Sequence, residues 1–120
     1  MAALMLGLAA STAQAANFDK GWEAYQRGDY EATLKEFKPL AKEGHAWAQY
    51  HLGLMYGKGQ GVPQDAAEGY AWLNLAALQG LEEAQKFRGD VKKFMPSSEL
   101  ERAQPLSQEY YKKYVAPFQK

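Results

Sequence analysis

Cysteine is absent from the 120-residue sequence, and neither sign of charge is in excess. The lack of cysteine excludes a disulfide framework, a thiolate zinc site and a cysteine nucleophile. Fourteen basic residues balance fourteen acidic ones, whereas nucleic-acid-binding domains usually carry a clustered basic surface. The composition therefore gives no electrostatic reason to expect nucleic acid or an anionic membrane surface as a partner.

A long apolar run is also lacking. Residues 1–15, MAALMLGLAASTAQA, carry no charge, but crossing a bilayer takes about 20 apolar residues. The stretch ends in a small-x-small site of the kind that signal peptidase accepts, so we predict a signal peptide at residues 1–15. The mature chain would then begin at Ala16, without membrane insertion, in a periplasmic or secreted protein. No Lys or Arg opens the stretch, which leaves a natural start elsewhere, or a retained N-terminal helix, as alternatives.

Strand-like alternation of apolar and polar residues is missing as well, and helical repeats stand in its place. GHAWAQ at residues 44–49 recurs as GLEEAQ at residues 80–85, and the same offset of 36 residues pairs Asp29 with Asp65. A period in the mid-thirties is typical of helix-turn-helix units stacked in an array. The sequence therefore predicts an all-α fold built from repeats.

Apolar periodicity predicts four helices, at residues 17–27, 29–43, 46–56 and 65–79. Asp29 and Asp65 stand where a side-chain oxygen caps a helix N-terminus, and Asp65 with Glu68 matches a capping box. Gly44 and Gly80 are expected to end their helices as C-caps.

Proline and serine residues set the remaining helix expectations. Pro39 lies inside the second helix and predicts a kink or an early end there. A last helix is expected near the C-terminus, with Ser98 and Glu101 as its capping box. Pro105 should bend or interrupt that helix.

The glycine-rich stretch YGKGQGVPQD, residues 56–65, contains Lys58, a combination often found in phosphate-binding loops. Leu52 stands where a P-loop needs its first glycine, and Gly59 stands where it needs Ser or Thr. A helix is expected before the loop, whereas the phosphate-binding motifs follow a strand. We interpret the stretch as a tight helix-to-helix turn with glycines at positive φ and with Val62 tucked under it.

Residues 48–80 resemble one full Sel-1-like repeat. The matching positions are small, aromatic and loop residues at fixed spacing: Ala48, Leu52, Gly53, Tyr56, Gly59, Gly61, Val62, Asp65, Trp72, Ala76, Ala77 and Gly80. Residues 21–37, GWEAYQRGDYEATLKEF, resemble the related tetratricopeptide repeat. The resemblance implies a short right-handed array of helix-turn-helix units, an α-solenoid, over residues 16–95. A C-terminal capping helix and tail would occupy residues 96–120.

Small residues explain how such a repeat packs. By the resemblance, Gly53 and Ala76 let two helices approach closely, while Tyr56 and Trp72 fill the space between units. The family usually has alanine where this chain has Gly69, and a glycine inside a helix costs about 1 kcal/mol relative to alanine.

Aromatic residues make up the candidate binding site. First helices line the concave face of tetratricopeptide-like stacks, and several aromatic residues fall on the first helix of each expected unit. The resemblance therefore implies a protein-binding face formed by Trp22, Tyr25, Trp47, Tyr50, Leu54 and Lys58. The alternative is that these aromatic side chains pack between helices.

No catalytic, metal or cofactor site is predicted. His45 and His51 are six residues apart with no clustered carboxylates. Some Sel-1-like relatives are described as β-lactamase-like, but this sequence lacks an S-x-x-K motif and cysteine, so that activity is not transferred. The predicted function is a non-enzymatic adaptor in the cell envelope that binds a protein or peptide. An envelope hydrolase of peptidoglycan-related or β-lactam amides, a structural subunit of an envelope complex, and self-association remain alternatives.

Overall fold

The structure, a computed structural model, describes residues 16–119. The predicted signal peptide at residues 1–15 therefore lies outside the described residues. The described chain folds into helices alone: α2 (Phe18–Gln26), α3 (Tyr30–Lys42), α4 (Ala46–Lys58), α5 (Ala66–Leu78), α6 (Glu82–Lys92), α7 (Ser97–Tyr114) and the short 3-10 helix η1 (Ala116–Phe118). The predicted all-α class is confirmed.

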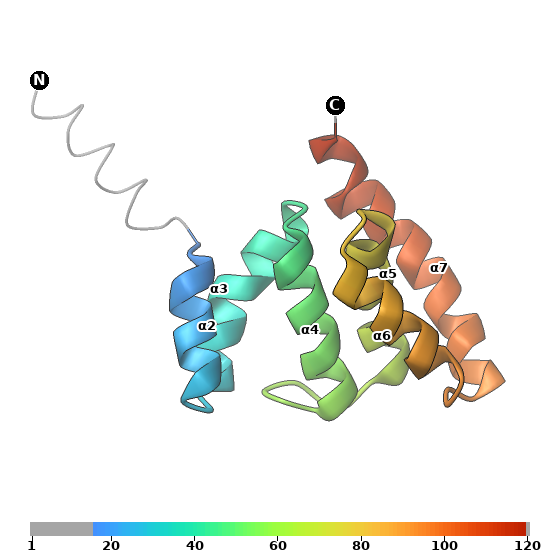
Figure 1. Cartoon of the computed structure of the whole chain (residues 1–120), viewed down its shortest axis with the longest axis horizontal. Coiled ribbons are helices and arrows are strands. Elements are labelled where there is room, and N and C mark those ends of the chain that lie inside the picture. The colour runs from blue at the N-terminus through green and yellow to red at the C-terminus, as the bar shows by residue number, and fades with distance from the viewer. Residues whose placement is uncertain (1–15, 120) are drawn as a thin grey trace, which may run out of the picture.

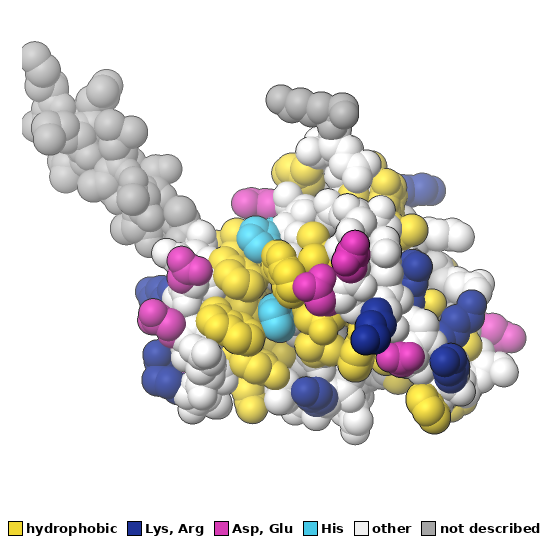
Figure 2. Space-filling model, in the orientation of Figure 1, with side chains coloured by type: hydrophobic (Ala, Val, Ile, Leu, Met, Phe, Trp, Pro, Cys, Tyr) yellow, Lys and Arg dark blue, Asp and Glu magenta, His cyan; other side chains and the backbone are white. Residues whose placement is uncertain are grey.

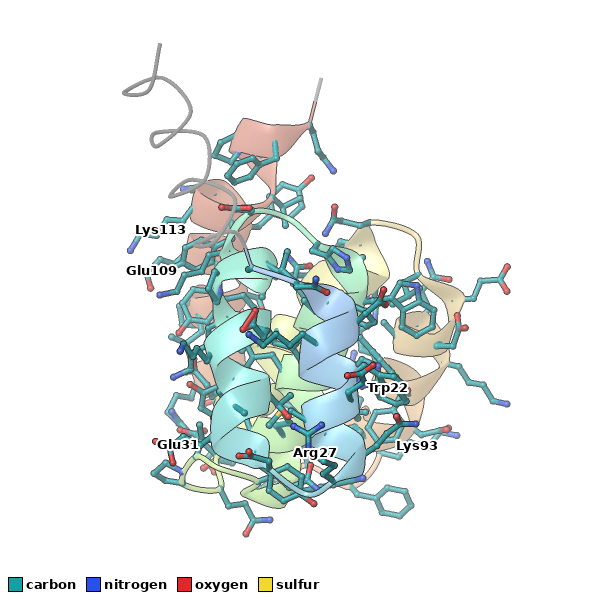
Figure 3. The ribbon with its side chains drawn as sticks, turned by 90° about the vertical axis from the view of Figure 1, so that its left-hand side faces the viewer. Trp22, Arg27, Glu31, Lys93, Glu109 and Lys113 are labelled. Atoms are coloured by element: carbon teal, nitrogen blue, oxygen red, sulfur yellow. The ribbon has the colours of Figure 1, made fainter. Side chains whose placement is uncertain are left out.

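Helices α2 and α3, and then α4 and α5, form antiparallel pairs that stand side by side as a helical repeat array, and α6 and α7 both pack on α5 (Figure 1). Helix α2 packs against α3, α3 against α4 and α4 against α5, while α5 contacts both α6 and α7. Seen from the end of the array, α2 and α6 stand towards one side and α3 and α7 towards the other (Figure 3). The array therefore has two faces, and the first helices of the pairs share one of them. Within residues 16–119, no helix combines the length and the apolar composition that crossing a membrane requires.

Helix ends follow the local signals of the sequence. The side chain of Asp29 accepts a hydrogen bond from the Ala32 amide at 3.2 Å, and the side chain of Asp65 accepts one from the Glu68 amide at 3.1 Å. Gly44 and Gly80 follow helix ends with φ values of 92° and 96°, a conformation that glycine adopts without steric cost. These predicted caps are confirmed because they depend only on residues within one turn of chain.

Both prolines contradict the early helix ends that the sequence suggested. Helix α3 continues past Pro39 to Lys42, and α7 continues past Pro105 to Tyr114. Both proline residues are exposed, so water can bind the carbonyl that each ring leaves without its helical partner. The tertiary contacts of the two helices then outweigh the loss of one hydrogen bond each.

The predicted capping box at Ser98 and Glu101 is wrong. Helix α7 begins at Ser97, Pro96 occupies the capping position, and no side chain caps the helix there. Ser98 consequently lies inside the first turn, two positions after the capping position.

The core lies where α3, α4, α5 and α7 meet. Its largest fully buried side chains are Phe37, Leu52, Met55 and Leu75, together with the polar Gln49. Gln49 donates to the carbonyl of Ala41 at 2.9 Å, which satisfies its buried amide. Such a continuous core joins the repeats into one body.

A pair of glycines sets the distance between α4 and α5. A β-carbon on Gly53 would lie 2.8 Å from the Gly69 carbonyl oxygen, and one on Gly69 would lie 2.8 Å from that of Gly53. From the sequence, Gly53 was expected to allow the close approach together with Ala76, and Gly69 was expected only to lower the stability of its helix. The structure corrects this: Gly69 is the partner of Gly53, and an alanine there would collide with backbone.

Candidate functional site

Helices α2 and α4 bring aromatic side chains onto the face that the first helices share. Trp22 and Tyr25 lie one turn apart on α2, as do Trp47 and Tyr50 on α4, a spacing that places side chains on one helix surface. Trp22 points from α2 towards the side on which Lys93 lies, away from Glu109 and Lys113 (Figure 3). In Figure 2 the apolar side chains gather between α2 and α4, with both imidazole rings visible among them.

His51 lies at the centre of these rings. The ring centroids nearest to it belong to Trp22 at 4.9 Å and Tyr50 at 5.1 Å. Four further rings have their centroids 5.8–6.2 Å away: Phe37, Tyr25, Trp47 and Phe18. We call His51, Trp22, Tyr25, Trp47 and Tyr50 the aromatic face.

The central position of His51 was not predicted from the sequence, although a signal for it was present. His51 follows Trp47 by four residues, and Leu54 follows Trp47 by seven, which is the helical stripe already used for the aromatic side chains. What the sequence could not show was that α2 would supply rings to the other side of the same imidazole.

The environment of His51 keeps its ring uncharged. Burial, aided by the positive charge of Lys58, lowers the pKa of His51 to about 4. Its Nδ1 is buried and has no hydrogen-bond partner among the described residues. The centre of the aromatic face is therefore neutral at physiological pH.

The aromatic face continues onto α6. Trp47 meets Tyr50 edge-on at 5.7 Å, and Tyr50 meets Phe87 edge-on at 6.5 Å. Trp47 is 39% exposed and Phe87 is 38% exposed, so neither is needed to fill the core. Burial and the charge of Glu83 on α6 raise the pKa of Tyr50, which places an acidic group at this end of the face.

Leu54 and Lys58, the two other residues of the predicted site, do not lie among the four aromatic residues. They line a pocket of about 210 Å³ between α4, α5 and α6. Its lining is mostly apolar or glycine: Gly53, Leu54, Gly57, Lys58, Ala66, Gly69, Tyr70, Leu73, Phe87 and Val91. Lys58 is the one charged residue in that lining. The predicted site residues thus fall into two neighbouring parts of one face.

The glycine-rich loop that joins α4 to α5 has a structural role. Gly59 and Gly61 adopt φ values of 70° and 74°, as expected for a tight turn, and Val62 packs against the core. Gln60 accepts from the Tyr25 hydroxyl and donates to that of Tyr30, both at 3.2 Å. Tyr25 consequently fastens the loop to the first helix pair as well as contributing to the aromatic face.

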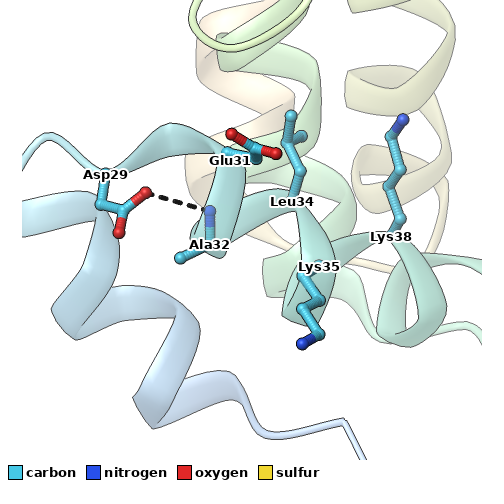
Figure 4. Close-up of a pocket in the computed structure, with 6 residues that line it drawn as sticks. All are labelled: Asp29, Glu31, Ala32, Leu34, Lys35 and Lys38. Atoms are coloured by element: carbon cyan, nitrogen blue, oxygen red, sulfur yellow. Dashed lines mark hydrogen bonds between the residues drawn. The ribbon is translucent and has the colours of Figure 1, made fainter.

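A wide hollow at the start of α3 has the residue types of a polar site but not its geometry (Figure 4). The carboxylate of Asp29 is engaged with the Ala32 amide, and the side chains of Lys35 and Lys38 point apart. No set of polar groups converges there on one position.

The opposite face carries a hydrogen-bond network that fastens α7 to the array. Glu68 accepts from the Tyr110 hydroxyl at 2.6 Å and from Trp72 Nε1 at 3.3 Å. Burial and the bond to Glu68 raise the pKa of Tyr110. Trp72 also lies against the rings of Tyr110 and Tyr114 at 4.8 and 5.4 Å. The capping box predicted for Asp65 and Glu68 is only half formed, because the Asp65 amide donates to the Tyr56 carbonyl at 2.9 Å and the Glu68 carboxylate binds Tyr110 and Trp72 instead.

The two histidines do not form a metal site. His45 Nδ1 accepts from the Ala48 amide at 3.1 Å and so caps α4, whereas His51 lies within the aromatic face. Among residues 16–119, no three His, Cys, Asp or Glu side chains gather in a way that could hold a metal ion.

Comparison with known proteins places the repeat in a family. Residues 48–81 match the family model described as Sel1 repeat. A negative regulator of exopolysaccharide production from Rhizobium leguminosarum bv. viciae is 32% identical over 72 residues, which are 60% of this chain and 27% of that protein. The DAP3-binding cell death enhancer 1 of Rattus norvegicus is 40% identical over 58 residues, which are 48% of this chain and 11% of that protein.

A solved structure has the same fold. It is a protective antigen present in uropathogenic Escherichia coli strains, described as displaying an SLR fold, with a TM-score of 0.74 and 26% sequence identity. The match covers 84% of this chain and 23% of the antigen. This chain spans about a quarter or less of each of these relatives. Sel1 repeats generally mediate protein–protein interaction, and proteins of this fold are typically non-enzymatic adaptors.

Proposed function

We propose that this chain, which belongs to the Sel1-like repeat proteins, is a non-enzymatic adaptor that binds a protein or peptide on its aromatic face. One observation carries the proposal: Trp47 and Phe87 leave more than a third of their surface exposed, and Tyr50 joins them into one row of aromatic rings across α4 and α6. Aromatic side chains are enriched among the residues that dominate binding energy at protein interfaces. An apolar patch that folding leaves uncovered is typical of an interaction site.

Of the four aromatic residues, Trp22, Tyr25 and Tyr50 are partly buried against the core, and Trp47 is the exposed one. Trp22 and Trp47 approach His51 from different helices, at 4.9 and 6.1 Å, and rings held on two helices present a rigid surface. Rigid aromatic anchors lose little conformational entropy on binding. We therefore assign binding roles to Trp22, Tyr25, Trp47 and Tyr50, with Leu54 and Lys58 at the edge of the same surface.

The names of the relatives agree with a role exerted through partners. One relative is named as a negative regulator and another as DAP3-binding. We propose that this chain supplies a recognition step in a role of this kind.

We further propose that the adaptor acts in the periplasm or outside the cell. The support is the uncharged stretch of residues 1–15 and its Ala13-Gln14-Ala15 end. The mass of the protein recovered from its native cell tests this: cleavage predicts a chain that begins at Ala16. Recovery of the uncleaved chain from the cytoplasm would contradict the proposed location.

Affinity capture tests the adaptor function. The full chain is the bait, beside a Trp47→Ala, Tyr50→Ala double variant whose helical circular dichroism matches that of the wild type. We expect a protein that the wild type retains and the variant loses. If both baits retain the same protein, the adaptor function stands and the face is wrong.

The remaining outcomes separate the alternatives. A partner that copurifies in fixed ratio and never exchanges would favour a structural subunit of an envelope complex. If neither bait retains a protein, the adaptor proposal fails, and turnover of peptidoglycan fragments and β-lactams would then test the hydrolase alternative.

A further inference from the structure

The pocket between α4, α5 and α6 exists because one helix position has no side chain. Gly53 and Gly69 bring the backbones of α4 and α5 into contact. One turn further along α4, a β-carbon on Gly57 would meet no atom within 4 Å. The contact between α4 and α5 at Gly53 and Gly69 thus lies next to open space at Gly57, and no side chain at position 57 fills that space.

The size and lining of this pocket fit one apolar side chain. Its volume is about 210 Å³, and Leu54, Leu73, Phe87 and Val91 are among its lining residues. An apolar protein cavity of about 150 Å³ is large enough to bind benzene, whereas pockets for drug-sized ligands usually start at about 300 Å³. The pocket therefore fits one aromatic or large aliphatic group better than a cofactor.

The charge at the pocket is positive and unpaired. Lys58 is its one charged lining residue, and the ion pairs among the described residues do not include it. The charge of Lys58 also affects the aromatic face, because it helps to lower the pKa of His51. Lys58 therefore acts on both parts of the face, and a nearby carboxylate would neutralise it.

We infer that the partner is a protein segment that inserts one large apolar side chain into this pocket and places the carboxylate of a neighbouring Asp or Glu on Lys58. The inference rests on the proposed adaptor function and specifies the partner's chemistry. The aromatic face would then bind the residues on either side of this apolar–acidic pair.

Glycine positions provide a matched test of the pocket. Gly57→Leu fills it from a position where a β-carbon meets nothing, so the helix can accept the larger residue. Gly89→Leu is the control, because Gly89 is also helical, also meets nothing within 4 Å and does not line the pocket. Both variants replace a helical glycine, so helix propensity changes equally.

The probe is a library of random twelve-residue peptides displayed on phage and selected against the full chain. We expect the retained peptides to share a large apolar residue with an acidic neighbour. Gly57→Leu should weaken binding of a representative peptide about 10- to 100-fold, the effect of withholding one large side chain from burial. Gly89→Leu should leave it unchanged.

Lys58→Gln tests the acidic contact separately. It should weaken binding about 2- to 5-fold at low salt, as for an exposed ion pair, and the difference should shrink at high salt. Replacing the peptide's acid by its amide should give the same loss. Combining the two changes should add nothing further.

The outcomes keep the two proposals apart. If Trp47→Ala abolishes peptide binding while Gly57→Leu does not, the adaptor function stands and the pocket inference is overturned. Retained peptides without an acidic neighbour would also overturn it, as would a dimer in sedimentation that Gly57→Leu dissociates, since the occupant would then be a second copy. If no peptide is retained, the pocket inference is overturned, while the adaptor function is decided by the affinity capture.

Discussion

Gly53 and Gly69 face each other across α4 and α5. A β-carbon on either glycine would lie 2.8 Å from the carbonyl oxygen of the other. Each glycine thus permits the other's backbone to approach. This contact sets the spacing of α4 and α5, and therefore the shape of the pocket that Gly53 lines together with Leu54 and Lys58.

Gly53→Ala should destabilise the protein by about 1–3 kcal/mol. The added methyl group meets backbone, which cannot rotate away, so the helices must separate and strain the core. Urea unfolding measures the change. Gly57→Ala is the control, because its methyl group enters open space and should raise stability by up to about 1 kcal/mol. Equal effects of the two substitutions would contradict the assigned contact.

Trp72→Ala and Trp47→Ala should separate stability from binding. Trp72 is 4% exposed, so its loss should cost about 3–5 kcal/mol in unfolding free energy. Trp47 is 39% exposed, so its loss should cost about 1 kcal/mol or less in stability. Binding of the partner should fall at least about 30-fold if Trp47 is an anchor. Chemical denaturation and a binding titration on both variants check this; an unchanged affinity for Trp47→Ala would remove it from the site.

The protein should lose stability as the pH is lowered, because of His51. Its folded pKa of about 4 lies below the ordinary value of 6.5, so between these values the unfolded chain binds a proton that the folded chain does not. The stabilising contribution is complete above about pH 6.5 and is lost as the pH falls towards 4. Because the ring is partly exposed, we expect the loss to be about 1–2 kcal/mol. The check is urea unfolding from pH 7.5 to 4.5 beside His51→Gln, whose stability should decline less; parallel curves would contradict it.

Tyr110→Phe should loosen α7. The hydroxyl of Tyr110 donates to Glu68 at 2.6 Å, and its removal leaves a partly buried carboxylate one donor short. The expected cost is about 1–3 kcal/mol, as for hydrogen bonds to charged groups. The neighbouring Tyr111 donates to Gln119 at an exposed position, so Tyr111→Phe should cost less. Thermal unfolding measures the stability of both variants. A larger loss of stability for Tyr111→Phe would contradict the conclusion that the bond to Glu68 holds α7 in place.

Several features of the site were accessible from sequence because they repeat at helical spacing. The stripes on α2 and α4 predicted that Trp22 would share a surface with Tyr25, and Trp47 with Tyr50. The division of Leu54 and Lys58 into a separate pocket was not accessible, since Phe87 and Val91 reach them only through the packing of α6 on α5.

The sequence by itself determined helices α2 to α5, the Asp29 and Asp65 caps and the glycine turn between α4 and α5, because each depends on residues within a few positions of one another. Only the tertiary structure decided the roles of His51, Gly69 and Glu68. Each of these residues acts through a partner on another helix, at a distance in the chain that local propensity does not encode. Long-range packing selects which side chains converge, so it alone turned a stripe of aromatic residues into a face with a neutral centre and a pocket beside it.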